Sequence, residues 1–235
     1  MITPGELQQR LETFHSDRFN LQVPTASELH GYQLLDLDRD SGALHEAFYY
    51  LDGKGPKYTL AELCARQNTV TVLDAGCGTG NQLVSLFQQT IIIEGVEPER
   101  LLGDAVSDYD FSRFGEKRRT RVALGAGLVN YAVLDLAAEK LPPSSYDLAY
   151  SYEVHLHNKR PERIIDNVFQ SLKPGGVMYF NTDGRQLEQV NAHVKQYRQS
   201  GTEVLSGEII PTYGWLPPNR KHETRHAFKL TRPLA

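Results

Sequence analysis

The chain has 235 residues, 40% of them hydrophobic, which is enough for one sizeable core and favours a single globular unit. A net charge of −4 and a sequence pI near 6.1 give no overall attraction to nucleic acid or to an anionic membrane. Two cysteines make no disulfide framework, and no apolar run approaches the ~20 residues of a membrane span. Because a signal-peptide pattern is also missing, we expect a cytoplasmic protein.

Residues 1–68 carry three helix start signals, each a threonine followed three positions later by a glutamate. The pairs are Thr3 with Glu6, Thr25 with Glu28, and Thr59 with Glu62. This spacing is typical of the capping box, in which each side chain accepts a backbone N–H of the first turn. We therefore predict a segment of short helices ahead of the first strand.

The most informative segment is Thr71–Gly80, where an apolar strand runs into Asp74 and then into glycines at alternate positions. An amphipathic helix over Asn81–Gln89 is predicted to follow. A strand, a glycine loop and a helix N-terminus form the nucleotide-binding corner of a doubly wound α/β sheet. The dinucleotide motif G-x-G-x-x-G is excluded, because its last position would fall on Asn81 or Leu83. The segment therefore predicts a site for another adenosine-containing cofactor.

Two further strands are predicted, each ending in an acidic residue. The run Ile91–Glu97 is rich in β-branched residues, and Glu97 lies 17 positions after Gly80. That is close to the ~20 positions that place an acid at the tip of the next strand, where two carboxylate oxygens can accept both ribose hydroxyls. The third strand, Val129–Leu134, leads to Asp135.

The remaining chain alternates between strand and helix signals. We predict strands over 146–151, 177–181, 202–213 and 222–230, with helices over 161–171 and 186–199. Pro161 opens the first of these helices, and the run Leu172-Lys173-Pro174-Gly175-Gly176 ends it.

These motifs, in this order, resemble those of the class I S-adenosylmethionine-dependent methyltransferases over roughly residues 69–183. The matching elements are D-A-G-C-G-T-G from Asp74, Tyr146–Ser151, and L-K-P-G-G from Leu172. The resemblance implies a Rossmann-like methyltransferase fold: a doubly wound, mostly parallel, seven-stranded sheet whose last strand is antiparallel. It also implies S-adenosyl-L-methionine as cofactor and S-adenosyl-L-homocysteine as product.

The resemblance further implies which residues bind the cofactor. Asp74 would lie near the sulfonium and the ammonium of the methionyl tail, Glu97 would bind the ribose, and Asp135 would accept from the adenine amino group. The full implied set is Asp74, Gly76, Cys77, Gly78, Gly80, Glu97, Pro98, Asp135, Leu136 and Ser151.

The same resemblance divides the chain into an N-terminal helical lid or cap, residues 1–68, and a methyltransferase core, residues 69–235. The alternative for the N-terminal helices is simple packing against the edge of the sheet, and both alternatives stay open.

A general base is needed when the methyl acceptor carries a proton. The end of the fourth strand borders the ligand crevice and is followed by Glu153 and His155. His155 is the first candidate because its ordinary pKa of ~6.5 suits proton removal near neutrality. Glu153 is the second, as a partner for a cationic acceptor. We expect no metal site, since only Asp147 and Asp183 lie nearby as oxygen ligands.

The leading hypothesis is methyl transfer to an oxygen or nitrogen of a small-molecule acceptor. One alternative is a protein or RNA methyltransferase that uses the basic cluster within 113–121, which is otherwise a solvated face. Another is a non-catalytic, cofactor-binding regulatory module. The sequence carries no signal for an oligomeric state.

Overall fold

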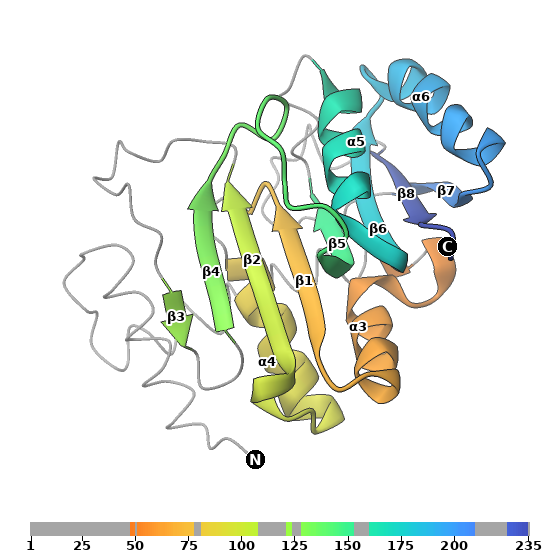
Figure 1. Ribbon diagram of the computed structural model, residues 1–235. Coiled ribbons are helices and arrows are strands. Elements are labelled where there is room, and N and C mark those ends of the chain that lie inside the picture. The colour runs from red at the N-terminus through yellow and green to blue at the C-terminus, as the bar shows by residue number, and fades with distance from the viewer. Residues whose placement is uncertain are drawn as a thin grey trace, which may run out of the picture.

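The structure is a computed structural model, and it describes residues 48–49, 51–77, 81–107, 121–123, 128–152, 160–209 and 225–234. An eight-stranded sheet with the order β3-β4-β2-β1-β5-β6-β8-β7 forms the centre of this part of the chain (Figure 1). The strands are β1 (Val70–Ala75), β2 (Leu101–Ser107), β3 (Arg121–Ala123), β4 (Leu128–Val133), β5 (Tyr146–Ser151), β6 (Leu172–Asp183), β7 (Glu203–Ile209) and β8 (Arg225–Thr231). The helices are α3 (Gly55–Arg66), α4 (Asn81–Glu94), α5 (Pro161–Ser171) and α6 (Leu187–Gln199), with a short 3-10 helix η1 (Pro98–Arg100).

The helices cover both faces of the sheet, as Figure 1 shows for α4 and α5. On one face, α3 and α4 bury side chains such as Leu60 and Phe87 against β1 and β5. On the other face, α5 and α6 bury Ile165 and Val194 against the same strands and β6. Each face therefore has its own apolar core, which is the arrangement of a doubly wound sheet.

Among the described residues, no helix is long and apolar enough to cross a membrane.

The strand directions confirm the predicted fold class. The pairs β1–β2, β1–β5, β2–β4 and β5–β6 are parallel, whereas β8 pairs antiparallel with both β6 and β7. The sheet contains one strand beyond the seven predicted: the three-residue β3, which pairs antiparallel with β4 at the edge. The division into a cap over 1–68 and a core over 69–235 stays a prediction, although α3 already packs within the core of the sheet.

The predicted strand over 91–97 is wrong, because Ile91–Glu94 forms the last turn of α4. Leu83, Phe87 and Ile91 are spaced four residues apart and are all buried in the same cluster, so Ile91 extends the apolar face of the helix. The helix ends where Gly95 adopts a φ of 66° and donates its N–H to the Ile91 carbonyl. Ile91 therefore packs as part of helix α4, and the second strand begins later, at Leu101.

The start predicted for a helix at Thr59 is also wrong. α3 begins four residues earlier, at Gly55, with Pro56 in its first turn, where a missing N–H has no cost. Thr59 is buried inside the helix, and its Oγ1 lies 2.7 Å from Tyr179 Oη. The helices predicted around Thr3 and Thr25 lie outside the described residues.

The contact between α4 and β2 requires a glycine. A Cβ at Gly103 would lie 2.8 Å from Leu83 Cδ2 and 2.9 Å from Phe87 Cζ, both on α4. Those side chains are fully buried and have little room to move. Gly103 therefore sets how closely α4 approaches β2, at the level where Gly103 pairs with Val72 of β1.

We expect Gly103→Ala to lower the free energy of unfolding by about 1–3 kcal/mol, because the added methyl overpacks this contact. Gly184→Ala is the matched control, since a Cβ there would meet nothing within 4 Å. Urea denaturation measures both variants. Equal stability of the two would contradict the tight contact at Gly103.

Candidate functional site

The carboxyl ends of five parallel strands lie at one edge of the sheet, in the order β4, β2, β1, β5, β6. β1 has β2 on one side and β5 on the other, so the chain leaves β1 in one direction and later returns on its other side. In open α/β sheets this switch point opens a crevice for ligands. The candidate site is therefore the edge formed by Ala75, Ser107, Val133 and Ser151.

The turn after β1 is fixed by backbone hydrogen bonds. Gly76 has a φ of 84°, a conformation that suits glycine. The N–H groups of Gly76 and Cys77 both donate to the Val106 carbonyl, at 2.7 and 2.9 Å. These two hydrogen bonds to β2 hold the start of the glycine loop at the sheet edge. The Cys77 side chain is buried in the core.

Asp74 and Ser151 are the buried polar side chains of β1 and β5 next to this turn. Asp74 is 1% exposed, and Ser151 is fully buried. Asp74 lies level with Tyr150 across the β1–β5 pair, so Ser151 lies one residue nearer the end of its strand, and its side chain points to the opposite face of the sheet. Ser151 Oγ has no hydrogen-bond partner among the described residues. Buried polar groups of this kind are expected where another molecule completes the site.

Asp135 lies in the turn that follows β4, as predicted. Its Oδ1 accepts the Ala137 N–H at 3.0 Å, and its own N–H donates to Glu139 Oε1 at 2.9 Å. Leu136 is buried beside it and anchors the turn in the core. Asp135 is exposed at the sheet edge. Its predicted contact with adenine stays a prediction, with one carboxylate oxygen already used by its own turn.

Glu97 and Pro98 are misplaced for the predicted cofactor role, and this is a correction. Glu97 is exposed and precedes η1, whose end leads into Leu101 at the amino end of β2. Leu101 pairs with Val70, the first residue of β1, whereas the glycine loop follows the last residue. At ~3.3 Å per residue, the length of β2 puts roughly 20 Å between these two ends. The error follows directly from the assignment of Ile91–Ile93 to a strand.

Two further residues near the ends of strands escaped the sequence prediction, one by its place in the sequence and one by its place in the structure. Asp108 directly follows β2 in the sequence, 28 positions after Gly80, and lies outside the described residues. The modest apolar run Leu101–Val106 was the available signal, and the stronger isoleucine run concealed it. Thr182, near the end of β6, is fully buried, and its Oγ1 has no hydrogen-bond partner among the described residues.

Several predicted residues lie outside the described residues: Gly78, Gly80, Glu153, His155 and the basic cluster within 113–121 apart from Arg121, which begins β3. Their roles stay predictions. In the described part of the chain, no group of three or more His, Cys, Asp or Glu could hold a metal ion.

Comparison with known proteins defines the family. Residues 41–231 match the methyltransferase domain family, which is most of the chain. A sterol 24-C-methyltransferase of Aspergillus fumigatus is 29% identical over 135 residues, which cover 56% of this chain and 32% of the relative. A ubiquinone biosynthesis O-methyltransferase of Coxiella burnetii is 26% identical over 117 residues, covering 50% of this chain and 45% of that protein. The chain thus spans less than half the length of these curated relatives.

Among solved structures, a Listeria monocytogenes protein assigned to the class I S-adenosylmethionine-dependent methyltransferases superposes with a TM-score of 0.56 at 14% identity. The match covers 97% of this chain and 87% of the other, and at this identity it supports the fold alone. Together with the family match, it confirms the class that the sequence motifs resemble. The chain belongs to the methyltransferase domain family.

The described residues fit the cofactor of this class. S-adenosylmethionine carries a sulfonium cation, an amino-acid tail with an ammonium and a carboxylate, and a nucleoside, and it lacks phosphates. The site offers a buried carboxylate, a turn that begins with a glycine at positive φ, and a buried hydroxyl without a partner. This set suits a cation and a polar tail better than it suits a phosphate, because the buried Asp74 carboxylate would repel a second negative charge.

We expect Thr182→Val to leave the free energy of unfolding unchanged or higher, because the hydroxyl it removes is buried without a partner in the described structure. The matched control is Thr59→Val, which removes one of the hydrogen bonds of Tyr179 and should cost about 1 kcal/mol. Chemical denaturation without cofactor measures both. A loss at position 182 as large as at position 59 would show that Thr182 is already satisfied.

Proposed function

We propose that this chain is an S-adenosylmethionine-dependent methyltransferase that acts on a small-molecule acceptor. The main observation behind the proposal is the buried Asp74 carboxylate, placed directly before the Gly76 turn at the switch point of the sheet. The family match supports the reaction class. The printed names of both relatives, a sterol and a ubiquinone-biosynthesis methyltransferase, support a small-molecule acceptor.

The proposed cofactor contacts follow the predicted set with one replacement. Asp74 would balance the positive charge of the tail, the loop from Gly76 through Gly80 would pack beside the nucleoside, and Ser151 would donate or accept at the β5 side. Asp135 and Leu136 would border the adenine. Asp108, at the carboxyl end of β2 in the sequence, takes the ribose-binding role first given to Glu97.

When bound, the cofactor supplies a methyl carbon activated by a sulfonium. The task of the protein is then to hold an acceptor in line with that carbon, an effect that can lower the barrier by ~7–11 kcal/mol. His155 would take the proton from an oxygen or nitrogen acceptor, which typically adds ~10²–10⁴-fold in rate. Glu153 would orient a cationic acceptor. Both follow β5 in the sequence, two and four positions after Ser151.

A pair of carboxylate variants tests the proposed ribose contact. We expect Asp108→Asn to weaken binding of S-adenosylhomocysteine by about tenfold or more, as for a lost charge-assisted hydrogen bond. Glu97→Gln, at the opposite end of β2, should leave the affinity within about twofold, because exposed groups ~20 Å away contribute little. Isothermal titration calorimetry measures both. The reverse order of effects would restore Glu97 to the site and contradict the strand assignment.

The reaction class is tested by turnover. With S-adenosylmethionine and a panel of phenols, carboxylic acids and amines, we expect production of S-adenosylhomocysteine that His155→Ala lowers by about 10²-fold or more. Cofactor binding should survive in this variant. Tight binding without turnover on any acceptor would favour the non-catalytic module, and turnover on RNA or protein substrates alone would favour the macromolecular alternative.

A further inference from the structure

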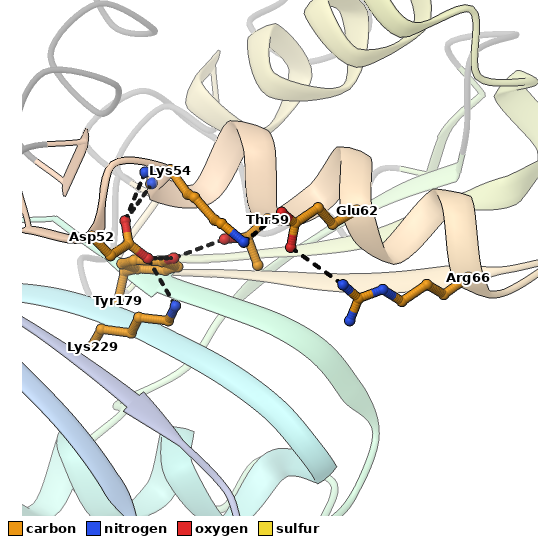
Figure 2. A network of polar contacts seen from close by, with 8 residues as sticks. Asp52, Lys54, Thr59, Glu62, Arg66, Tyr179 and Lys229 are labelled. Atoms are coloured by element: carbon orange, nitrogen blue, oxygen red, sulfur yellow. Dashed lines mark hydrogen bonds and ion pairs between the residues drawn. The ribbon is translucent and has the colours of Figure 1, made fainter.

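A buried polar cluster connects the segment before α3 to strands β6 and β8 (Figure 2). Asp52 Oδ2 accepts from Tyr179 Oη at 2.7 Å and from Lys229 Nζ at 2.8 Å. Its other oxygen, Oδ1, accepts the N–H groups of Lys54 and Gly55 at 2.9 and 2.8 Å. One carboxylate thus joins its own loop to β6 and β8, across 127 and 177 positions of the sequence. We call Asp52, Thr59, Tyr179 and Lys229 the Asp52 cluster.

The proton positions in the cluster follow from the chemistry of its members. Burial raises the pKa of Tyr179 far above its ordinary value, and the nearby Asp52 raises it further, so the phenol keeps its proton and donates it to Asp52. Thr59 must then donate to Tyr179 Oη, since that oxygen has no second proton. Burial alone would raise the pKa of Asp52, but the donors Gly55, Lys229 and Tyr179 outweigh it and lower that pKa. The carboxylate is therefore charged and faces Lys229.

The cluster lies level with the candidate cofactor site. Asp74, Tyr150, Tyr179 and Lys229 are register partners on the neighbouring strands β1, β5, β6 and β8. Register partners place their side chains on the same face, and neighbouring strands lie ~4.8 Å apart, so about 10 Å separates the Cα atoms of Asp74 and Tyr179. Tyr150 fills the space between them.

An aromatic contact links the same segment to the end of β5. Phe48, four residues before Asp52, is fully buried and packs on Tyr179 with ring centroids 5.4 Å apart. Its ring also meets Tyr152 edge-on at 6.2 Å. Tyr152 follows Ser151 directly and precedes Glu153 in the sequence. The position of Phe48, which Asp52 helps to fix, therefore influences the position of Tyr152, the first residue beyond β5.

The ion pair between Asp52 and Lys229 carries a large desolvation penalty. The side chains of Asp52 and Lys229 are 5% and 18% exposed, so both charges lose most of their hydration. An apolar pair of similar size would hold the segment with less desolvation, but it would not fix one geometry as four directed hydrogen bonds do.

We propose that Asp52 and Lys229 are positioning residues: their ion pair fixes the segment 48–54 so that Phe48 and Tyr152 form the acceptor-facing side of the methyl-transfer site. The inference rests on the proposed function and adds a specific role for a cluster about two to three strands away from Asp74.

The test compares two lysine–aspartate pairs. Lys229→Met breaks the Asp52 cluster, and Lys229→Arg keeps the charge and serves as a milder variant that folds even where the first does not. The control is Lys173→Met, because Lys173 pairs with the buried Asp147 at 2.7 Å near the amino ends of the strands, where Asp147 also binds Thr71. Among the described contacts, Lys173 does not touch the segment 48–54.

Two measurements are made on the full chain. Hydrogen exchange of the peptide covering 48–55 should speed up by about tenfold or more in Lys229→Met, and little in Lys229→Arg or Lys173→Met. Calorimetry should show an S-adenosylhomocysteine affinity within about twofold of the wild type in each, with the ratio of S-adenosylmethionine to S-adenosylhomocysteine affinity changed at least about threefold in Lys229→Met alone. The two cofactor forms differ only by the methyl group and its charge, so this ratio reports on the groups that face the methyl.

An unchanged ratio in Lys229→Met, or the same change in Lys173→Met, would reduce the cluster to a structural role and overturn the inference. Unchanged hydrogen exchange would show that the ion pair does not hold the segment, with the same consequence. Failure of the wild type to bind either cofactor form would overturn the proposed function instead, while the exchange experiment would still decide whether the pair holds the segment.

Discussion

The parallel pairing of β1 with both β2 and β5 is the constraint on which the rest of the structure depends. Because parallel strands end at the same edge, it brings Asp74, the Gly76 turn and Ser151 together without any direct contact being required among them. It also makes the two ends of each strand functionally unequal. A carboxylate near the amino end of β2, such as Glu97, faces solvent, whereas Ser107 at the carboxyl end of β2 lies at the ligand edge.

Much of the fold could be read from the sequence, because strands such as Tyr146–Ser151 and the L-K-P-G-G turn carry local signals that agree with the tertiary structure. The second strand could not. Ile91–Ile93 has strand propensity, but Ile91 lies at helical spacing from Leu83 and Phe87 and is buried with them on one face of α4. Gly95 at the end of that helix was the signal that would have corrected it.

The site was predictable to the same extent as the strands that carry it. Asp74, Gly76 and Ser151 lie on or next to strands that were placed correctly, whereas the strand predicted to end at Glu97 is wrong, and the cofactor role of each residue stays a prediction. Thr182 and the Asp52 cluster had no local signal at all. Their roles depend on contacts between residues more than a hundred positions apart, such as Thr59 with Tyr179, which only the folded sheet defines.

The distribution of polar groups within the sheet separates stability from function. At the amino ends, Asp147 is satisfied by Thr71 and Lys173, and Arg100 and Arg232 donate to carbonyls at the ends of α3 and α5. At the carboxyl ends, Ser151 and Thr182 are buried without partners in the described structure, each at a cost of about 1–3 kcal/mol. A ligand that supplies those partners would recover part of this cost on binding, because binding to the folded state alone shifts the unfolding equilibrium. Among the described residues, the carboxyl edge of the sheet therefore holds buried polar groups without hydrogen-bond partners, and a molecule that binds there can stabilise the protein by supplying them.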